Sequence, residues 1–296
     1  MGTLVGHVAP GFGFLVIGLW HLLNHIKLHV QNPKTYHSLP WFPSKIRYLE
    51  LFLIMVACSM SIAMELFIGP DRHQPLDTDG TIPSNHLHNF EHSLISFTFF
   101  VYAIFAIILD KFVPKVQYEL TQLLASIAFG QQLLLFHLHS ADHMGVEGQY
   151  HMLLQVLILI SLVTTLMGIS YQKSFVVSFI RSISISFQGL WLMVMGFMLW
   201  TKNLIPKGCF LNLEEGHHVV RCHDLEALER AKSLVNIQFS WYLICVTIFA
   251  MSLYVTMHRI YEGRIEYESL TRYDQDQDIE AQKTMIKSFD PIDMEK

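Results

Sequence analysis

Fifteen residues near the middle of the chain, HLHSADHMGVEGQYH at 137–151, concentrate side chains that could bind a metal ion or transfer protons. Four of them are histidines and two are carboxylates, and the stretch joins two apolar runs, LLASIAFGQQLLLF and MLLQVLILISLV. Imidazole and carboxylate groups coordinate transition metals and exchange protons near neutral pH. The pattern therefore indicates a polar site where two apolar segments meet.

The composition indicates that the solvent of these apolar segments is lipid. Hydrophobic residues make up 52% of the 296 residues, charged residues only 15%, and the mean hydropathy is +0.35, outside the usual range of soluble chains. A spanning helix needs about 20 apolar residues. Seven runs satisfy this length: 4–24, 46–68, 88–110, 117–139, 148–171, 178–201 and 236–259. We therefore predict an all-α fold, a seven-transmembrane helix bundle in one domain over residues 1–259.

The distribution of Lys and Arg predicts the orientation of the bundle, because cytosolic connections are enriched in both. On one side lie Lys27, Lys34, Lys45, Lys111, Lys115, Lys173, Arg181, Arg259, Arg264 and Arg272. The other side has Arg72 and the several basic residues of one long connection, 202–235. The N-terminus is therefore expected to be extracytoplasmic and the C-terminus cytosolic.

The two ends of the chain and its charge complete the classification. The first apolar run has no preceding Lys or Arg and no clear cleavage site, so we expect a retained helix. Residues 260–296 are polar and acidic and predict a disordered cytosolic tail. No basic surface interleaved with aromatic residues indicates nucleic-acid binding. The expected partners are the lipid bilayer and a metal ion, and a homo-oligomer is compatible with the sequence.

Two of the four cysteines share the long extracytoplasmic connection, which faces an oxidising compartment. We therefore expect a disulfide between Cys209 and Cys222 rather than two free thiols. Cys58 and Cys245 lie within predicted spans and are expected to act as small core residues.

The predicted topology brings titratable groups from five helices to the extracytoplasmic third of the bilayer. His88 and His92 are four residues apart, as are Glu147 and His151, so each pair shares a helix face. Ionisable groups inside spans usually face the interior and are paired or functional. The expected metal ligands are Glu65, His92, His137, His139, Glu147 and His151, with His7, His88 and Glu91 in second rank. A histidine-rich set with carboxylates and no thiolate favours Zn²⁺, followed by other transition metals.

The role of the expected metal stays open between structural, catalytic and transported. His88-Asn-Phe-Glu91-His92 matches H-x-x-E-H, in which two histidines hold zinc and the glutamate is the base. This short match supports an alternative function, a zinc-dependent intramembrane hydrolase of a lipid or amide. A transporter would need a second polar station nearer the cytosol, for which the sequence offers few candidates.

Polar residues near the cytosolic ends of the spans have a simpler interpretation. His21, His25 and His29 recur every four residues and are expected to contact headgroups at the interface, where Arg181 is expected to anchor its helix. The fourteen-residue spacing of His7 and His21 raises a further alternative, a haem or metal carrier. Only His258 offers an opposing ligand for a second haem, so this alternative ranks last.

Seven segments give the chain a resemblance to a known family. These segments are GHVAPG (6–11), GLW (18–20), Glu65, FEH (90–92), FHLHS (136–140), EGQYH (147–151) and RSISISFQGLW (181–191). Together they resemble the plant-type members of the transmembrane protein 45 family, which is classed as a domain of unknown function. The resemblance implies a seven-helix protein of the secretory pathway or plasma membrane, without an established activity. It places His7, Glu65, His92, His137, His139 and His151 at motif positions, and implies no required histidine at position 88.

Overall fold

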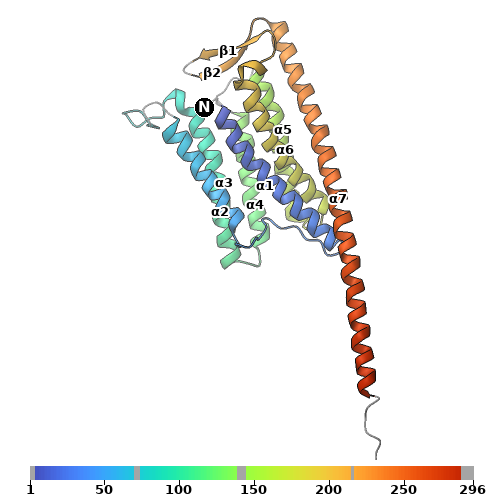
Figure 1. Cartoon of the computed structure of the whole chain (residues 1–296). Helices are drawn as coiled ribbons and strands as arrows, with labels where there is room; N and C mark the ends of the chain where they lie inside the picture. The colour runs from blue at the N-terminus through green and yellow to red at the C-terminus, as the bar shows by residue number, and fades with distance from the viewer. Residues whose placement is uncertain (1–3, 70–73, 139–144, 215–216, 288–296) are drawn as a thin grey trace, which may run out of the picture.

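The structure is a computed structural model that describes residues 4–69, 74–138, 145–214 and 217–287, with only the backbone of His217 and of residues 262–287. It is mostly helical, as predicted (Figure 1). The long helices are α1 (Leu4–Gln31), α2 (Leu49–Ala63), α3 (Leu87–Phe112), α4 (Gln117–His137), α5 (Val146–Ser170), α6 (Phe175–Trp200) and α7 (Leu225–Lys287). Shorter elements are η1 (Met64–Ile68), η3 (Ser84–His86), η4 (Lys202–Leu204), β1 (Cys209–Glu214) and β2 (His217–Cys222).

Six helical segments within the described part of the chain are long and apolar enough to cross a membrane. They are Leu4–Gln31, Leu49–Ile68, Ser84–Phe112, Val146–Ser170, Phe175–Trp200 and Leu225–Tyr261. α4, which was also expected to span the membrane, is not among the six. It has 21 residues and packs between α3 and α5, but its apolar sequence is interrupted by glutamines and Glu119. Large apolar side chains lie exposed along the six segments, for example Phe52, Val56 and Met60 of α2. An exposed surface of this kind requires an apolar solvent, and the chain is therefore described as an integral membrane protein.

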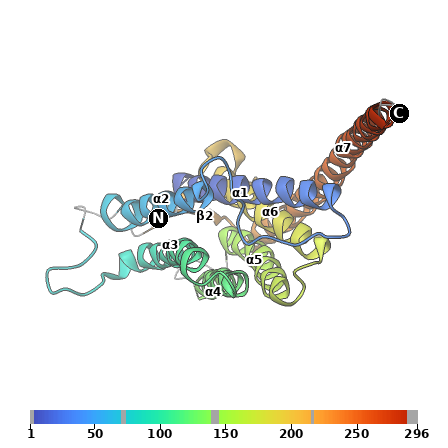
Figure 2. The ribbon, with the colours of Figure 1, turned by 90° about the horizontal axis from the view of Figure 1, so that it is seen from below.

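α6 is the central helix of the bundle. In its most apolar 18-residue stretch 72% of the residues are buried, against 11% in α2 and in α7. α1 packs along α6 (Figure 2), and this contact is more extensive than that between any other two helices in the described part of the chain. Glycines allow this approach, since a Cβ on Gly18 would lie 2.4 Å from the Ser186 backbone nitrogen, and one on Gly189 would lie 2.2 Å from that of Leu15. Small residues at helix interfaces let backbones approach closely in membranes.

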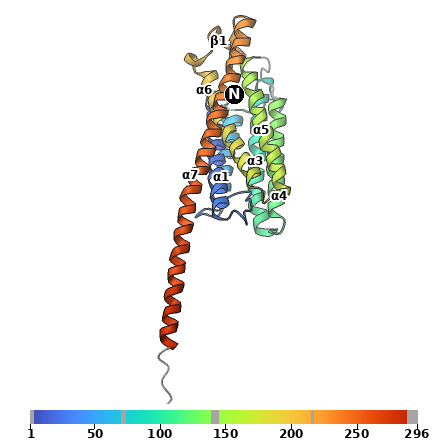
Figure 3. The same cartoon turned by 90° about the vertical axis from the view of Figure 1, so that its right-hand side faces the viewer.

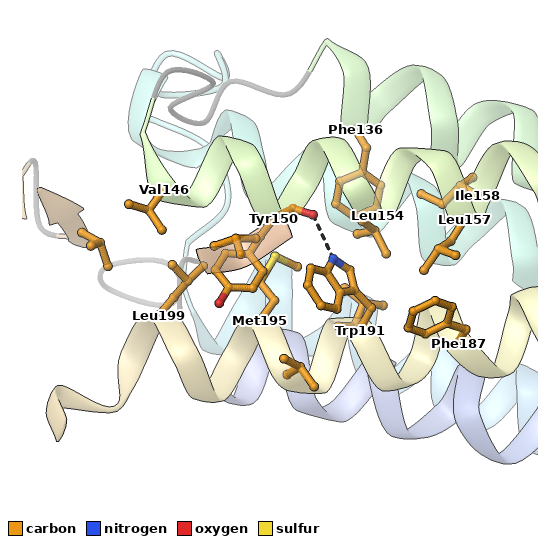
Figure 4. Close-up of a cluster of buried hydrophobic side chains, with 14 of the residues drawn as sticks. Phe136, Val146, Tyr150, Leu154, Leu157, Ile158, Phe187, Trp191, Met195 and Leu199 are labelled. Atoms are coloured by element: carbon orange, nitrogen blue, oxygen red, sulfur yellow. Dashed lines mark hydrogen bonds between the residues drawn. The ribbon is translucent and has the colours of Figure 1, made fainter. Parts of the chain in front are cut away.

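The largest apolar core lies between α5 and α6 (Figure 4). Side chains of α7 pack against this core. Trp191 is fully buried there, and its indole Nε1 donates to the Tyr150 carbonyl oxygen at 3.0 Å. Phe239 of α7 packs against the same indole with ring centroids 4.9 Å apart. This core fixes the register of α5, which carries His151, against α6.

A β-hairpin and the start of α7 occupy most of the connection that the sequence predicted as a loop at 202–235. β1 and β2 pair in antiparallel register with Cys209 opposite Cys222, and the predicted disulfide joins these two residues. Arg221 donates two hydrogen bonds to the Glu214 carboxylate, which lowers the pKa of Glu214 to about 2. Cys58 is only half-buried and Cys245 is exposed, so the prediction that both are core residues was wrong.

The hairpin and the start of α1 lie at one end of the bundle, which we call the hairpin end (Figure 1). The connections 32–48, 113–116 and 171–174 lie at the opposite end, which we call the loop end. α7 continues as a helix far past the loop end (Figure 3) to Lys287, across the boundary at residues 259 and 260 that the sequence suggested. The division into a membrane domain and a tail stays a prediction.

Candidate functional site

Two groups of histidine and charged side chains, buried or half-buried, stand out in the described part of the bundle. The hairpin-end cluster consists of His7, Glu65, Asn89, His92 and His151, from α1, η1, α3 and α5. The loop-end cluster consists of His21, His25, Tyr36, Glu50 and Arg181, with Trp20 and Gln122 at its edge. The sequence predicted a site at the first position and none at the second.

Glu65 is the carboxylate of the hairpin-end cluster. It lies in the π-helical turn η1 that ends the second span, and π turns of this kind often occur at functional sites. Its side chain is buried, Asn89 Nδ2 donates to its Oε2 at 2.8 Å, and His92 Nδ1 lies 3.4 Å from its Oε1. Because a carboxylate oxygen accepts, Nδ1 of His92 carries the proton, and in the neutral ring the lone pair is on Nε2.

His7 and His151 form a second pair beside the first. Their ring centroids are 6.0 Å apart, and His7 also stacks on Trp200 at 4.5 Å. His151 Nδ1 donates to the Glu147 carbonyl oxygen at 3.1 Å, which again leaves the lone pair of the neutral ring on Nε2. Histidine ligands of metals commonly donate their other ring nitrogen to a carbonyl or carboxylate in this way.

Phe136 of α4 lies near one histidine of each pair. Its ring centroid is 5.7 Å from that of His151 and 6.3 Å from that of His92. Within the described residues, no three His, Cys, Asp or Glu side chains stand close enough to hold one ion. The chemistry of the donors suits zinc, but the arrangement consists of two pairs rather than a closed set of ligands.

The other predicted ligands lie elsewhere. His137 is exposed and its Nδ1 lies 3.2 Å from Gln155 Oε1, whereas His139 falls outside the described residues. Glu147 is half-buried, one turn before His151. In the H-x-x-E-H segment, His88 and Glu91 are half-buried, and the rings of His88 and His92 are 6.4 Å apart at an interplanar angle of 75°.

The loop-end cluster corrects the expectation of an interfacial stripe. His21 is 7% exposed, His25 is fully buried and Arg181 is 4% exposed, so these side chains lie inside the bundle. His21 Nε2 lies 2.7 Å from Glu50 Oε1, while Trp20 Nε1 and the Phe42 backbone N–H both donate to Glu50 Oε2.

Arg181 connects the rest of the loop-end cluster. Its Nη1 donates to Gln122 Oε1 at 2.9 Å and its Nη2 lies 3.5 Å from His25 Nε2. Because Nε2 of His25 accepts, its Nδ1 donates to the Tyr36 hydroxyl at 2.8 Å. The sequence signal for this cluster was the four-residue spacing of His21 and His25. The same spacing occurs on a buried helix face and on a face at the membrane interface, so it does not distinguish the two. The bundle thus has a second polar station, and the sequence-based argument against transport loses its main support.

Comparison with known families adds one match. The model of a family of unknown function (DUF716) matches residues 118–255 of this chain. The match covers most of α4, all of α5 and α6, the hairpin, and the part of α7 up to residue 255. It includes Arg181 and His151 but lies outside the segments that carry His7, Glu65 and His92. The comparison therefore assigns no activity to either cluster.

Proposed function

We propose that this chain is a seven-span membrane protein that binds a transition-metal ion, by preference Zn²⁺, at the hairpin-end cluster. α4 would be the seventh span, and the hairpin end would face the extracytoplasmic side. The resemblance to the transmembrane protein 45 family supports a location in the secretory pathway or plasma membrane. A homo-oligomer is compatible with the proposal and is not required by it.

The juxtaposition of the pairs Glu65–His92 and His7–His151 carries the proposal. Three imidazoles and one carboxylate are a common zinc set. A divalent ion would also compensate the charge of Glu65, whose burial in a span costs a few kcal/mol without a partner. Zinc binding would require the two pairs to close around Phe136 by rotation of the imidazole rings. In this role the chain would supply the ligands, and the ion would supply a Lewis acid or a structural link between four helices.

The metal content of the purified protein tests this proposal. The wild type, isolated in detergent without added metal, is expected to carry close to one zinc per chain by elemental mass spectrometry. His92→Ala and His151→Ala should each reduce the content at least tenfold, because each removes one imidazole from a four-ligand site. His137→Ala serves as the matched control at the same end of the bundle and should keep its zinc.

Several outcomes would decide against the site or reshape it. Background zinc in a wild type that elutes as a folded species would reject the proposal. Full zinc in His92→Ala and His151→Ala would locate the ion elsewhere. Zinc loss in His137→Ala would widen the set of ligands toward the 137–147 segment, as the sequence first suggested.

A zinc-dependent intramembrane hydrolase remains the second candidate, on the strength of Glu91 next to His92. A general base that is not a ligand can lose its charge without loss of the ion. Glu91→Gln and Glu147→Gln are therefore both expected to keep their zinc content within twofold of the wild type. The variant that removes the base should lower turnover of a lipid or amide substrate at least 100-fold. Loss of zinc would make the residue a ligand, and unchanged turnover in both variants would remove this candidate. A haem or metal carrier ranks third, since only the second polar station favours it.

A further inference from the structure

Arg181 is a buried cation within a membrane-length helix that, among the described residues, makes no contact with an acidic side chain. Within the described residues, no Asp or Glu oxygen lies within 4 Å of its guanidinium nitrogens, and its hydrogen-bond partners are the neutral Gln122 and His25. A guanidinium carries five N–H donors, and these two contacts use only two of them. A buried charge is expensive unless it is paired, and ionisable residues in spans commonly mark sites for ligands.

Glu50 does not take the role of counterion by contact. It is the carboxylate of the same cluster, but Trp20 and the Phe42 backbone N–H donate to its Oε2, while His21 lies against its Oε1. These contacts use both oxygens and hold Glu50 toward α1 and the connection that follows it. Arg181 therefore keeps its charge and donors available in the interior of the bundle.

The packing of α5 leaves room for the guanidinium. A Cβ built on Gly168 would lie 2.9 Å from Arg181 Nη1, so the group rests against bare backbone near the end of α5. The C-terminal carbonyls of a helix favour a nearby cation. They offset part of the cost of burial, but among the described residues the guanidinium hydrogen-bonds to Gln122 and His25 rather than to these carbonyls.

Polar residues occupy the face of α6 between the loop end and Arg181. Ser174 and Ser178 precede it by seven and three residues on one face of α6, and Ser178 is buried. An open cavity of about 320 Å³ lies at the start of this face. Its lining residues are His37, Ser170, Tyr171, Gln172, Lys173 and Ser174. Lys173 and the N-terminus of α6 both favour an anion at this entrance.

We propose that Arg181 anchors a binding site for a small oxyanion, a carboxylate or a phosphate, that enters through the cavity at the loop end. The guanidinium would hold two oxygens of the anion in a bidentate pair. Tyr36 and His25 lie beside it and contribute neutral polar groups, and burial raises the pKa of Tyr36 to about 12, so its hydroxyl stays protonated. The anion could be free or be the phosphate of a lipid headgroup at the same end. This site is independent of the metal proposed at the hairpin end.

Thermal unfolding of the full-length protein, followed by tryptophan fluorescence in neutral detergent, tests this site. Sodium phosphate and sodium acetate are titrated to 20 mM against sodium chloride at constant ionic strength. A ligand that binds only the folded state raises Tm by an amount that grows with the ratio of its concentration to its Kd, so the wild type should gain several degrees with at least one of the two anions. Arg181→Gln should lose this gain, with at least tenfold weaker binding.

Arg47→Gln is the matched control. Arg47 is an exposed arginine at the same end of the bundle, paired with Asp110 at 2.8 Å, and its loss should change anion binding less than twofold. Gly168→Ala is a second test that keeps Arg181 but moves its guanidinium, and it should weaken binding about fivefold. This variant decides the matter if Arg181→Gln does not fold.

The source of the anion is distinguished in a second titration with phosphatidic acid in phosphatidylcholine micelles. A gain with phosphate or acetate alone indicates a free anion, and a gain with phosphatidic acid alone that Arg181→Gln abolishes indicates a headgroup. A folded wild type that responds to none of the three probes overturns the proposal, as does an equal response in Arg181→Gln or an unchanged one in Gly168→Ala. Since no probe is a metal, failure here leaves the zinc proposal intact.

Discussion

Gly18→Val is expected to force α1 away from α6 and to destabilise the bundle by about 3 kcal/mol or more, at the upper limit for overpacked cores. A Cβ at position 18 would lie 2.4 Å from both the backbone nitrogen and the Oγ of Ser186, and 2.7 Å from its Cα. Two of these three atoms are backbone, so no rotation of a side chain can relieve the overlap. Thermal unfolding in detergent should show a Tm lower by about 10 °C.

Gly13→Val provides the comparison on the same helix. No atom lies within 4 Å of a Cβ built on Gly13, so the same change there should shift Tm by less than 2 °C. Gly189→Val attacks the contact from the α6 side, where the Cβ would lie 2.5 Å from the Gly11 carbonyl oxygen, and should resemble Gly18→Val. Equal Tm values for Gly13→Val and Gly18→Val would mean that α1 does not pack on α6 in this register.

The helices of this protein could be predicted from sequence because lipid imposes a simple requirement, about 20 apolar residues for each span. The run at 178–201 corresponds closely to α6, and the run at 4–24 lies within α1, which continues to Gln31. The closeness of these two helices could not be predicted in the same way. It depends on Gly18 facing Ser186, and glycines in spans are too frequent to identify a particular partner.

The hairpin shows a different limit. The pairing of Cys209 with Cys222 was predicted because the two residues share a connection that was expected to face an oxidising compartment, and the disulfide is present. The strands around them were not predicted, since CFLNLE and HHVVRC are short and lack a clear turn signal between them. Short strands are specified mainly by cross-strand packing, which only the structure displays.

The two clusters also differ in how far they could be predicted from sequence. Glu65 and His92 could be paired from sequence because η1 and α3 follow each other closely and their ionisable groups stand out in apolar runs. Arg181 and His25 are separated by 156 residues, and each lies near a helix end, where charged side chains usually reach the interface. Sequence position alone therefore placed both at the membrane surface, whereas helix packing buries them.

Glu50→Ala is expected to destabilise the loop end by about 3–5 kcal/mol, the range for breaking a buried ionic network from one side. The change removes the acceptor of three groups at once, namely the indole of Trp20, the ring nitrogen of His21 and the backbone N–H of Phe42. Glu50 is buried, so water cannot easily replace the carboxylate, and each donor left without a partner adds its desolvation cost. Chemical denaturation in detergent micelles measures this loss.

Glu119→Ala separates the network from the general effect of losing a carboxylate at the loop end. Glu119 is half-buried and accepts one hydrogen bond, from Gln172 Nε2 at 3.0 Å, while its Oε2 has no hydrogen-bond partner among the described residues. Its removal should cost about 1 kcal/mol or less. The double variant Glu50→Ala/His21→Leu should then be less destabilised than the sum of its single changes, because the second substitution removes a donor that the first left unpaired. Additive losses would show that Glu50 and His21 do not act as a pair, and the loop-end cluster would reduce to the contacts of Arg181.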